Sequence, residues 1–220
     1  MRRCAGLVPA AGAGLRLGRG PKAFVEVAGV PLIAHAVRAL SAVCDEVVVA
    51  VPGDALAAAR AHVPTAHVVA GAATRQGTVA ALLAATDAPY VVVHDAARPL
   101  TPRDVLRRAL DAAHADGAAT AALPVADTLH DVGRDAAVPR DALRAIQTPQ
   151  AFDADLLRRA HDAAADRGTD ATDDAALVRA LPHPVTLVRG SPWSHKITHA
   201  DDLAFVDALA RTATADAPPA

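Results

Sequence analysis

The sequence predicts an α/β protein in which a mostly parallel sheet is flanked by helices and carries a protruding β-arm. Short runs of β-branched residues alternate with alanine-rich stretches of helical periodicity over the first half of the chain. That alternation is typical of a parallel sheet with right-handed crossovers and helices on both faces. Around residues 126–149 it gives way to short, polar, turn-rich pieces, which indicate an inserted hairpin or arm.

The regular elements follow in order along the chain. The apolar run CAGLV predicts the first strand, and further buried strands are expected at residues 47–51, 67–70 and 90–95. The predicted helices between them cover residues 31–40, 54–63 and 74–86. Beyond the arm we expect helices at about 153–167 and 173–181, a strand at 184–190 and a helix after Asp201.

The chain has neither an internal repeat nor a recognisable linker, so we predict one domain. It covers residues 1–211 with the arm at about 126–149, and residues 212–220 are expected to form a disordered tail. A chain of 220 residues is long enough to bury a sizeable core. Hydrophobic residues make up 52% of it but aromatic residues only 2%, so the core must consist of closely packed Ala, Val and Leu.

Composition also limits the class of function. The formal net charge is −2, which excludes a global basic field for nucleic acid and makes any phosphate binding local. No apolar run approaches the ~20 residues of a membrane span. The 2 cysteines, Cys4 and Cys44, favour packing roles over a disulfide framework. We therefore expect a cytoplasmic protein without nucleic-acid or membrane partners.

The loop PAAGAGLRLGRGPKAF after the first strand predicts a phosphate site of unusual kind. Gly14 and Gly18 are one residue too close for a Walker A loop, and Leu17 stands where a dinucleotide fingerprint needs its third glycine. What remains is A-A-G-x-G-x-R followed by Pro-Lys. Glycines let backbone N–H groups approach phosphate oxygens, while Arg16 and Lys22 add positive charge. This combination suits a triphosphate that loses pyrophosphate during reaction.

A second stretch, YVVVHDAARP, places a carboxylate at the end of a predicted central strand. Ligands of such sheets bind beyond the carboxyl ends of the strands, so Asp95 and the phosphate loop should face the same site. A carboxylate there can hold Mg²⁺, which prefers oxygen ligands and is shared with substrate phosphates. The alternative interpretation is a turn cap by Asp95 with Arg98 in a surface ion pair.

These motifs carry a resemblance to a known family. The first loop is similar to the signature of nucleotidyltransferases that join a nucleoside triphosphate to a phosphorylated sugar or alcohol. Together with HDAARP it resembles the 2-C-methyl-D-erythritol 4-phosphate cytidylyltransferases of the non-mevalonate isoprenoid pathway. The resemblance continues in family order through GAATRQGTV, PVADTLH, RDALRAIQTPQAF, TDDAALV and HKITHADDL, and covers residues 7–205.

The resemblance implies a Rossmann-like nucleotidyltransferase sheet and an enzyme that transfers CMP from CTP to 2-C-methyl-D-erythritol 4-phosphate. The products would be 4-diphosphocytidyl-2-C-methyl-D-erythritol and pyrophosphate. It further implies Mg²⁺ as cofactor and a homodimer in which the arm of one subunit completes the site of its partner.

The resemblance also assigns site residues. The catalytic cations would be Arg16, Lys22 and Lys196, and the magnesium ligand would be Asp95. The nucleotide-binding residues would be Ala10, Ala11, Gly12, Gly14, Gly71 and Thr78. The polyol phosphate would meet Arg98, Thr128, Arg140 and Thr172, with Asp127 beside Thr128.

Several positions depart from the family pattern. Ala73 stands where many relatives have an acidic residue near the base, and His130 replaces a frequent lysine. Ser194 and Ala200 replace a usual asparagine and a usual proline. None of these changes removes an expected phosphate or metal contact, so they bear on base and substrate recognition and not on the reaction class.

Two alternatives remain open from the sequence. A cytidylyltransferase for ribitol 5-phosphate would use the same chemistry on another polyol phosphate, and its distinguishing residues should lie in the arm. A catalytically inactive nucleotide-binding protein would be expected to have lost one of its charged site residues. All four of these are present, namely Arg16, Lys22, Asp95 and Lys196.

Overall fold

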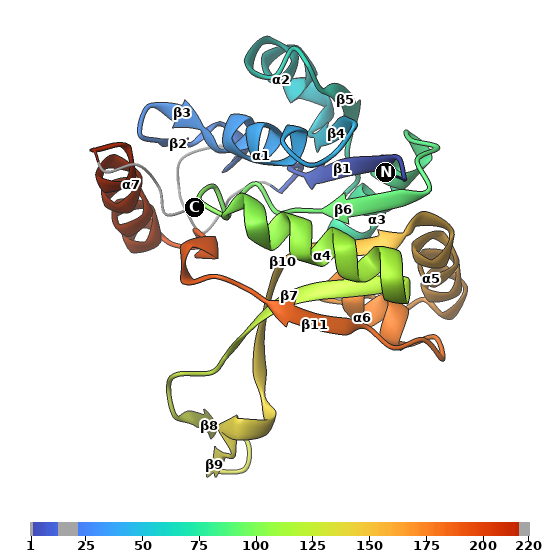
Figure 1. Ribbon diagram of the computed structural model, residues 1–220, viewed down its shortest axis with the longest axis vertical. Helices are drawn as coiled ribbons and strands as arrows, with labels where there is room; N and C mark the ends of the chain where they lie inside the picture. The colour runs from blue at the N-terminus through green and yellow to red at the C-terminus, as the bar shows by residue number, and fades with distance from the viewer. Residues whose placement is uncertain (1, 13–21, 216–220) are drawn as a thin grey trace.

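The computed structural model describes residues 2–12 and 22–215, and its centre is a seven-stranded sheet (Figure 1). The strand order is β11-β7-β10-β6-β1-β4-β5, and β10 runs antiparallel to both its neighbours while the other pairs are parallel. The mostly parallel α/β sheet predicted from the sequence is thereby confirmed. The strands are β1 (Cys4–Pro9), β4 (Glu46–Val51), β5 (His67–Ala70), β6 (Tyr90–Val93), β7 (Ala118–Pro124), β10 (Arg144–Asp153) and β11 (Thr186–Arg189).

Helices cover both faces of this sheet (Figure 1). One face packs against α1 (Leu32–Ser41), α2 (Leu56–His62), α4 (Arg103–Asp116) and α7 (Ala200–Ala215). The other packs against α3 (Arg75–Ala84), α5 (Ala154–Arg167) and α6 (Asp174–Arg179). Short 3-10 turns occur at η2 (Lys22–Phe24), η3 (Gly53–Ala55), η4 (Arg140–Ala142) and η5 (Pro192–Ser194).

The core is built from small aliphatic side chains on both faces, as the composition predicts. Successive residues of β1 point to opposite faces, so Leu7 joins the core beneath α3 and Val8 the core beneath α1. Both side chains are fully buried, and burial of such a side chain contributes ~1.5–3 kcal/mol. Strands buried on both faces read as continuous apolar runs, which is why the sequence shows no alternation there.

The arm leaves the sheet between β7 and β10 and ends in the hairpin of β8 (Leu129–Asp131) and β9 (Ala136–Val138) (Figure 1). β10 begins at Arg144, so residues 144–149 of the predicted arm interval belong to the main sheet. Apolar side chains lie exposed near the hairpin, among them Val132 with an exposed fraction of 88%. A second small sheet, β2 (Glu26–Val27) with β3 (Val30–Pro31), lies next to α7.

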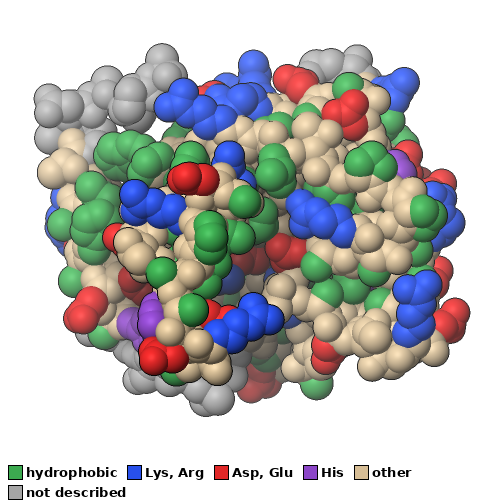
Figure 2. All heavy atoms as spheres, turned by 90° about the horizontal axis from the view of Figure 1, so that it is seen from below, with side chains coloured by type: hydrophobic (Ala, Val, Ile, Leu, Met, Phe, Trp, Pro, Cys, Tyr) green, Lys and Arg blue, Asp and Glu red, His purple; other side chains and the backbone are tan. Residues whose placement is uncertain are grey.

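Helix α7 extends to residue 215, into the interval 212–220 for which the sequence predicts a tail, and residues 216–220 lie outside the described residues. In the described part of the chain, no helix is both long and apolar enough to cross a membrane. On the face seen from the arm end, basic and acidic side chains are interspersed, with no single basic field (Figure 2).

Candidate active site

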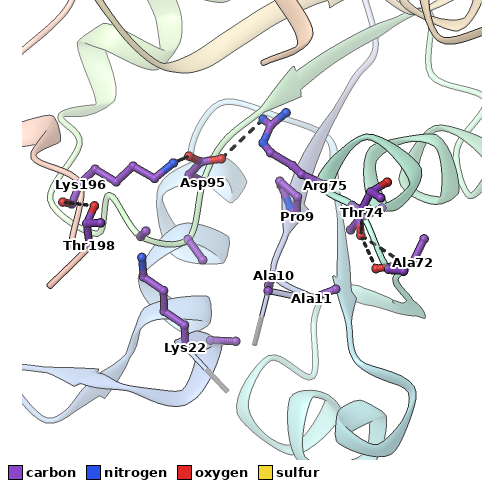
Figure 3. A pocket seen from close by; sticks show the side chains of 16 residues that line it. Pro9, Ala10, Ala11, Lys22, Ala72, Thr74, Arg75, Asp95, Lys196 and Thr198 are labelled. Atoms are coloured by element: carbon purple, nitrogen blue, oxygen red, sulfur yellow. Dashed lines mark hydrogen bonds and ion pairs between the residues drawn. The ribbon is translucent and has the colours of Figure 1, made fainter. Parts of the chain in front are cut away.

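A cleft of about 480 Å³ opens at the carboxyl ends of the parallel strands β1, β5 and β6 (Figure 3). β1 lies between β4 and β6, so the chain continues to one side of β1 and later returns to the other. Such a switch point is where open α/β sheets bind their ligands. The cleft is lined by residues 9–12, Lys22, Ala23, residues 72–75, Thr78, residues 95–97, Lys196 and Thr198.

The loop after β1 meets the loop after β5 in very close contact. The backbone N–H groups of Ala10 and Gly71 donate to carbonyls of β4, to Ala50 and Val51, each at 2.8 Å. A Cβ atom on Gly71 would lie 2.4 Å from the Cβ of Ala11, closer than real side chains approach. Only glycine at position 71 therefore lets these two predicted nucleotide-binding loops converge.

Thr78 supports this second loop from beneath. Its side chain is buried, and its hydroxyl accepts the N–H of Ala72 at 3.1 Å and lies 2.8 Å from the carbonyl oxygen of Thr74. The single hydroxyl proton is thus directed toward the loop backbone. Thr74 in turn caps α3, because its side chain accepts the N–H of Gly77 at 3.0 Å. Thr78 lines the cleft and also fixes the shape of the loop above it.

Asp95 lies on the floor of the cleft between two cations (Figure 3). Its carboxylate is 2.7 Å from Nζ of Lys196 and 3.6 Å from Nη2 of Arg75. Burial opposes ionisation, but the charges of Lys196 and Arg75 outweigh it and hold the pKa of Asp95 well below its ordinary value. The carboxylate is therefore ionised at neutral pH and available as an oxygen ligand.

A directional chain of hydrogen bonds holds the backbone of Asp95. Its N–H donates to Oγ1 of Thr148 at 3.0 Å, and that hydroxyl lies 3.2 Å from Nδ1 of His94. Nε2 of His94 lies 3.3 Å from the carbonyl oxygen of Arg98, which can only accept. The imidazole therefore carries a proton on Nε2. Burial lowers the pKa of His94 to about 4, so the ring is neutral at neutral pH.

The segment containing Lys196 is fastened to the strand end that carries Asp95. The N–H of Ile197 donates to the carbonyl of Ala97 at 2.9 Å, and Nζ of Lys22 donates to the carbonyl of Ile197. Two lysines that lie 174 positions apart in the chain therefore share one wall of the cleft. Both lysines line the same cleft as Asp95, which is the arrangement that the phosphate-site hypothesis requires.

Asp202, at the start of α7, organises the rest of this segment. One of its oxygens accepts the N–H groups of Thr198 and His199, each at 2.8 Å. The other lies 2.9 Å from Nε2 of His195. The bond to His195, followed by the backbone bond from His199, lowers the pKa of Asp202 to about 2.

Arg75 is a cleft residue that the sequence interpretation did not single out. Its guanidinium lies between Asp95 and Asp174, and Nη1 is 2.8 Å from the carboxylate of Asp174. Burial disfavours the charge, yet these two carboxylates raise the pKa of Arg75. Its position in the sequence could have indicated its importance, because Arg75 is the first residue of α3 and the first turn of that helix has no acidic residue. A cation there opposes the helix dipole and indicates a tertiary role.

The predicted site residues thus fall into three groups. The cleft lining includes Ala10, Ala11, Gly12, Lys22, Thr78, Asp95 and Lys196, and Gly71 lies directly against two of them. Gly14 and Arg16 lie outside the described residues. The residues predicted for the polyol phosphate, Arg98, Thr128, Arg140 and Thr172, do not appear in the cleft lining.

These acceptor residues have other surroundings within the chain. The guanidinium of Arg98 donates to the carbonyl of Ser194 at 2.6 Å, and burial lowers its pKa, partly offset by Asp95. Thr128 and Arg140 are exposed on the arm, where Arg140 donates to the carbonyl of Ala126. Thr172 is exposed just before α6.

Comparisons with known proteins show which family this chain belongs to. The family model for IspD, 2-C-methyl-D-erythritol 4-phosphate cytidylyltransferase, matches residues 4–212. The enzyme of that name from Thermus thermophilus is 47% identical over 211 residues, covering 93% of this chain and 96% of the relative. The one from Deinococcus radiodurans is 51% identical over 210 residues, covering 94% and 89%.

Solved structures give the same result. The crystal structure of 2-C-methyl-D-erythritol 4-phosphate cytidylyltransferase from Thermus thermophilus superposes with a TM-score of 0.85 at 44% identity, covering 96% of this chain and 100% of that one. Sequence motifs, sheet topology and similarity over nearly the whole length thus point the same way. The chain belongs to the family of 2-C-methyl-D-erythritol 4-phosphate cytidylyltransferases.

Proposed function

We propose that this protein transfers CMP from CTP to 2-C-methyl-D-erythritol 4-phosphate in isoprenoid biosynthesis. The products are 4-diphosphocytidyl-2-C-methyl-D-erythritol and pyrophosphate. Family membership supports the reaction, and one structural observation supports its location. Lys22, Lys196 and the ionised Asp95, from three distant parts of the chain, line a single cleft at the strand ends.

The chemistry is an in-line displacement at the α-phosphorus of CTP. A phosphate oxygen of the acceptor forms the new bond while the bond from the α-phosphorus to the bridging oxygen breaks, and the electron pair leaves with pyrophosphate. The attacking phosphate is already an anion near pH 7, so the reaction needs no general base. The obstacle is repulsion between two anions, and the cations of the cleft reduce it.

We assign Mg²⁺ to Asp95 as the cofactor of the reaction. The donor chemistry fits, because Asp95 is a buried, ionised carboxylate, and hard cations prefer such oxygens. The described residues contain no group of three or more His, Cys, Asp or Glu side chains able to hold a metal. The remaining ligands would therefore be phosphate oxygens and water. When bound, the ion neutralises charge on the triphosphate.

Lys196 and Lys22 act on the phosphates. Lys196 bonds to Asp95 and Lys22 to the carbonyl of Ile197, so both ammonium groups border the cleft. Arrival of the triphosphate offers Lys196 a more highly charged partner and uncovers a carboxylate oxygen of Asp95. We assign the same phosphate-binding role to Arg16, with Gly14 in the same loop.

The nucleoside half of CTP is held by the two loops that Gly71 allows to converge. Backbone groups of Ala10, Ala11 and Gly12 and the loop supported by Thr78 form this side of the cleft. Ala73 lies exposed on the same loop and contributes no carboxylate. We therefore expect base recognition to rely on the backbone of both loops and on Thr78.

The acceptor is bound between two subunits of a homodimer. Arg140 and Thr128 lie on an arm that projects from the sheet (Figure 1). The arm also exposes apolar side chains such as Val132. We infer that the arm reaches the cleft of a second copy, where Arg98 and Thr172 supply the other acceptor contacts. The small-molecule partners are CTP and the polyol phosphate, and we expect no nucleic-acid partner. We place the enzyme in the cytoplasm, where CTP is made.

The deciding experiment incubates the purified full chain with CTP and Mg²⁺ and follows pyrophosphate release. Methylerythritol phosphate and ribitol 5-phosphate are supplied in parallel. We expect release with the first and little with the second. Clear preference for ribitol 5-phosphate would establish the alternative substrate, and CTP binding without release from either acceptor would establish an inactive nucleotide-binding protein.

A further inference from the structure

Arg75 connects two parts of the molecule that the proposed reaction uses separately. One guanidinium nitrogen, Nη1, lies 2.8 Å from the carboxylate of Asp174. The other, Nη2, lies 3.6 Å from the carboxylate of Asp95, the contact drawn in Figure 3. Asp95 follows β6 and belongs to the nucleotide cleft, whereas Asp174 begins α6, directly after the segment that carries Thr172. A planar fork of donors can hold two carboxylates at a fixed separation, which an ammonium group cannot do.

Asp174 is a rigid anchor for this bridge. It is fully buried, and its second carboxylate oxygen lies 3.2 Å from Nε2 of His161. Its backbone N–H and that of Ala175 both donate to Oε1 of Gln150, at 3.1 and 3.0 Å. Gln150 lies in β10, so the start of α6 is fixed to the central sheet.

The neighbouring residue of α3 holds the same segment at its other end. Nε2 of Gln76 donates to the carbonyl of Thr169 at 3.3 Å, and Oε1 of Gln76 accepts the N–H of Ala171 at 3.2 Å. Arg75 and Gln76 therefore attach both ends of residues 169–174, which we call the acceptor segment, to the first turn of α3. Thr172 lies between these attachments and is exposed.

The same turn of α3 also belongs to the nucleotide cleft. The cleft lining includes Thr74 and Arg75, and the loop before them is the one that Thr78 supports. Movement of this turn when nucleotide binds would therefore be transmitted to the acceptor segment through three short contacts. Coupling of this kind needs a contiguous set of packed or bonded groups, and here each contact is identified.

We propose that Arg75 and Gln76 are positioning residues that couple occupation of the nucleotide cleft to the conformation of the acceptor segment. This role rests on the proposed function, because it assumes that Thr172 meets the polyol phosphate. Binding of CTP at Asp95 further stabilises the conformation in which these contacts hold residues 169–174, and the acceptor then binds to that surface. Arg75 forms ion pairs with Asp95 and with Asp174 at the end of the acceptor segment, so we expect it to act through that segment.

The test compares Arg75→Lys and Gln76→Ala with a matched control, Arg158→Lys. Arg158 also donates to α3 and to its following turn, at the carbonyls of Leu83 and Thr86, but at the helix end remote from the cleft. Hydrogen exchange of residues 169–174 is measured with and without CTP and Mg²⁺. We expect CTP to slow exchange in the wild type and in Arg158→Lys, and to leave it unchanged in Arg75→Lys and Gln76→Ala.

Steady-state kinetics supply the second readout. Loss of the Arg75 bridge or of the Gln76 bonds should raise the KM for methylerythritol phosphate about tenfold in each variant. The Kd for CTP, measured by calorimetry without acceptor, should stay within about twofold for Gln76→Ala, which keeps Arg75 beside Asp95. Equal CTP-induced protection of the acceptor segment in wild type and Arg75→Lys would overturn the coupling, as would absence of protection in the wild type.

The two readouts separate failure of the coupling from failure of the proposed function. A wild-type protein that releases no pyrophosphate with any polyol phosphate would disprove the function. The exchange experiment needs CTP and Mg²⁺ but no acceptor. It would therefore still decide whether Arg75 and Gln76 transmit the binding of CTP to residues 169–174. A variant with a raised KM for the acceptor, but with the same CTP-induced protection of residues 169–174 as the wild type, would also contradict coupling. The replaced residue would then contact the acceptor directly.

Discussion

Replacement of Lys196 by alanine should have opposite effects on turnover and on metal binding. The ammonium group lies 2.7 Å from Asp95, and the Lys196 side chain is 43% exposed. Because solvent screens such a pair, its loss should cost the folded state at most about 1 kcal/mol. The transition state should lose much more, ~3–4 kcal/mol or roughly 10²–10³ in kcat, because one of the cations that meet the departing charge is gone.

The metal affinity of the protein without nucleotide should increase in Lys196→Ala. In the wild type, a divalent ion that approaches Asp95 meets a carboxylate already paired with Lys196 and near Arg75. Without Lys196 one of these competing charges is absent, so Mn²⁺ followed by electron paramagnetic resonance should bind the nucleotide-free variant more tightly than the wild type. Lys196→Arg, which keeps the charge, serves as the control and should not gain metal affinity.

The assays are pyrophosphate release with CTP and methylerythritol phosphate, metal titration without nucleotide, and thermal unfolding. Slow turnover together with a Tm close to that of the wild type would place the loss in the reaction. Turnover near the wild-type value would refute the role of Lys196 in the transition state. Unchanged metal affinity in Lys196→Ala would refute the inference that Lys196 competes with the metal ion for the carboxylate of Asp95.

Three further predictions concern Gly71, Asp202 and Arg140. Gly71→Ala would press a methyl group against Ala11, at 2.4 Å, so calorimetry should show CTP affinity at least tenfold lower, with a loss in stability of ~1–3 kcal/mol by denaturant unfolding. The pKa of Asp202 falls from 3.8 to about 2 on folding, so its contribution is complete above the unfolded value and disappears as the pH falls toward 2. The Tm difference between wild type and Asp202→Asn should therefore shrink between pH 6 and pH 3, and a constant difference would contradict this. Mixing Arg140→Ala subunits with Lys196→Ala subunits should restore about a quarter of wild-type turnover if the arm serves the partner's site, and nothing if it serves its own.

The sequence was a sufficient guide to strands β1, β4, β5 and β6 because their signals are local, whereas β7, which pairs in parallel with β11, was not predicted as a strand. Short β-branched runs separated by helical stretches require crossovers, and β1, β4, β5 and β6 follow that pattern. The placement of β10 could not be read in this way. Its residues 144–153 look polar, yet Gln147 and Gln150 are buried in the sheet. Their amides bond to backbone groups at Ser191 and Asp174, far along the chain, and no local pattern encodes such partners.

The residues of the candidate site also differ in whether their role depends on a local sequence signal or on a distant partner. Asp95 could be predicted from its place at a strand end, because topology brings strand ends together, whereas Gly71 was assigned only by the family resemblance. Arg75 belongs to a quoted motif but was missed, since its importance depends on Asp174, 99 positions away. Thr78 was predicted as a base contact, and that role remains a prediction. The structure adds that its hydroxyl bonds to the loop backbone at Ala72 and Thr74.

The two cations at Asp95 are held differently, and the difference follows from their chemistry. Lys196 has a flexible stem and a compact charge, so it can exchange a carboxylate for a phosphate by rotation alone. Arg75 cannot leave as readily, because its departure would leave the fully buried Asp174 with His161 as its remaining side-chain partner. Breaking a buried pair of this kind costs ~3–5 kcal/mol. We therefore expect one cation to move to the substrate while the other stays, so that Asp95 remains ionised both before and after the triphosphate arrives.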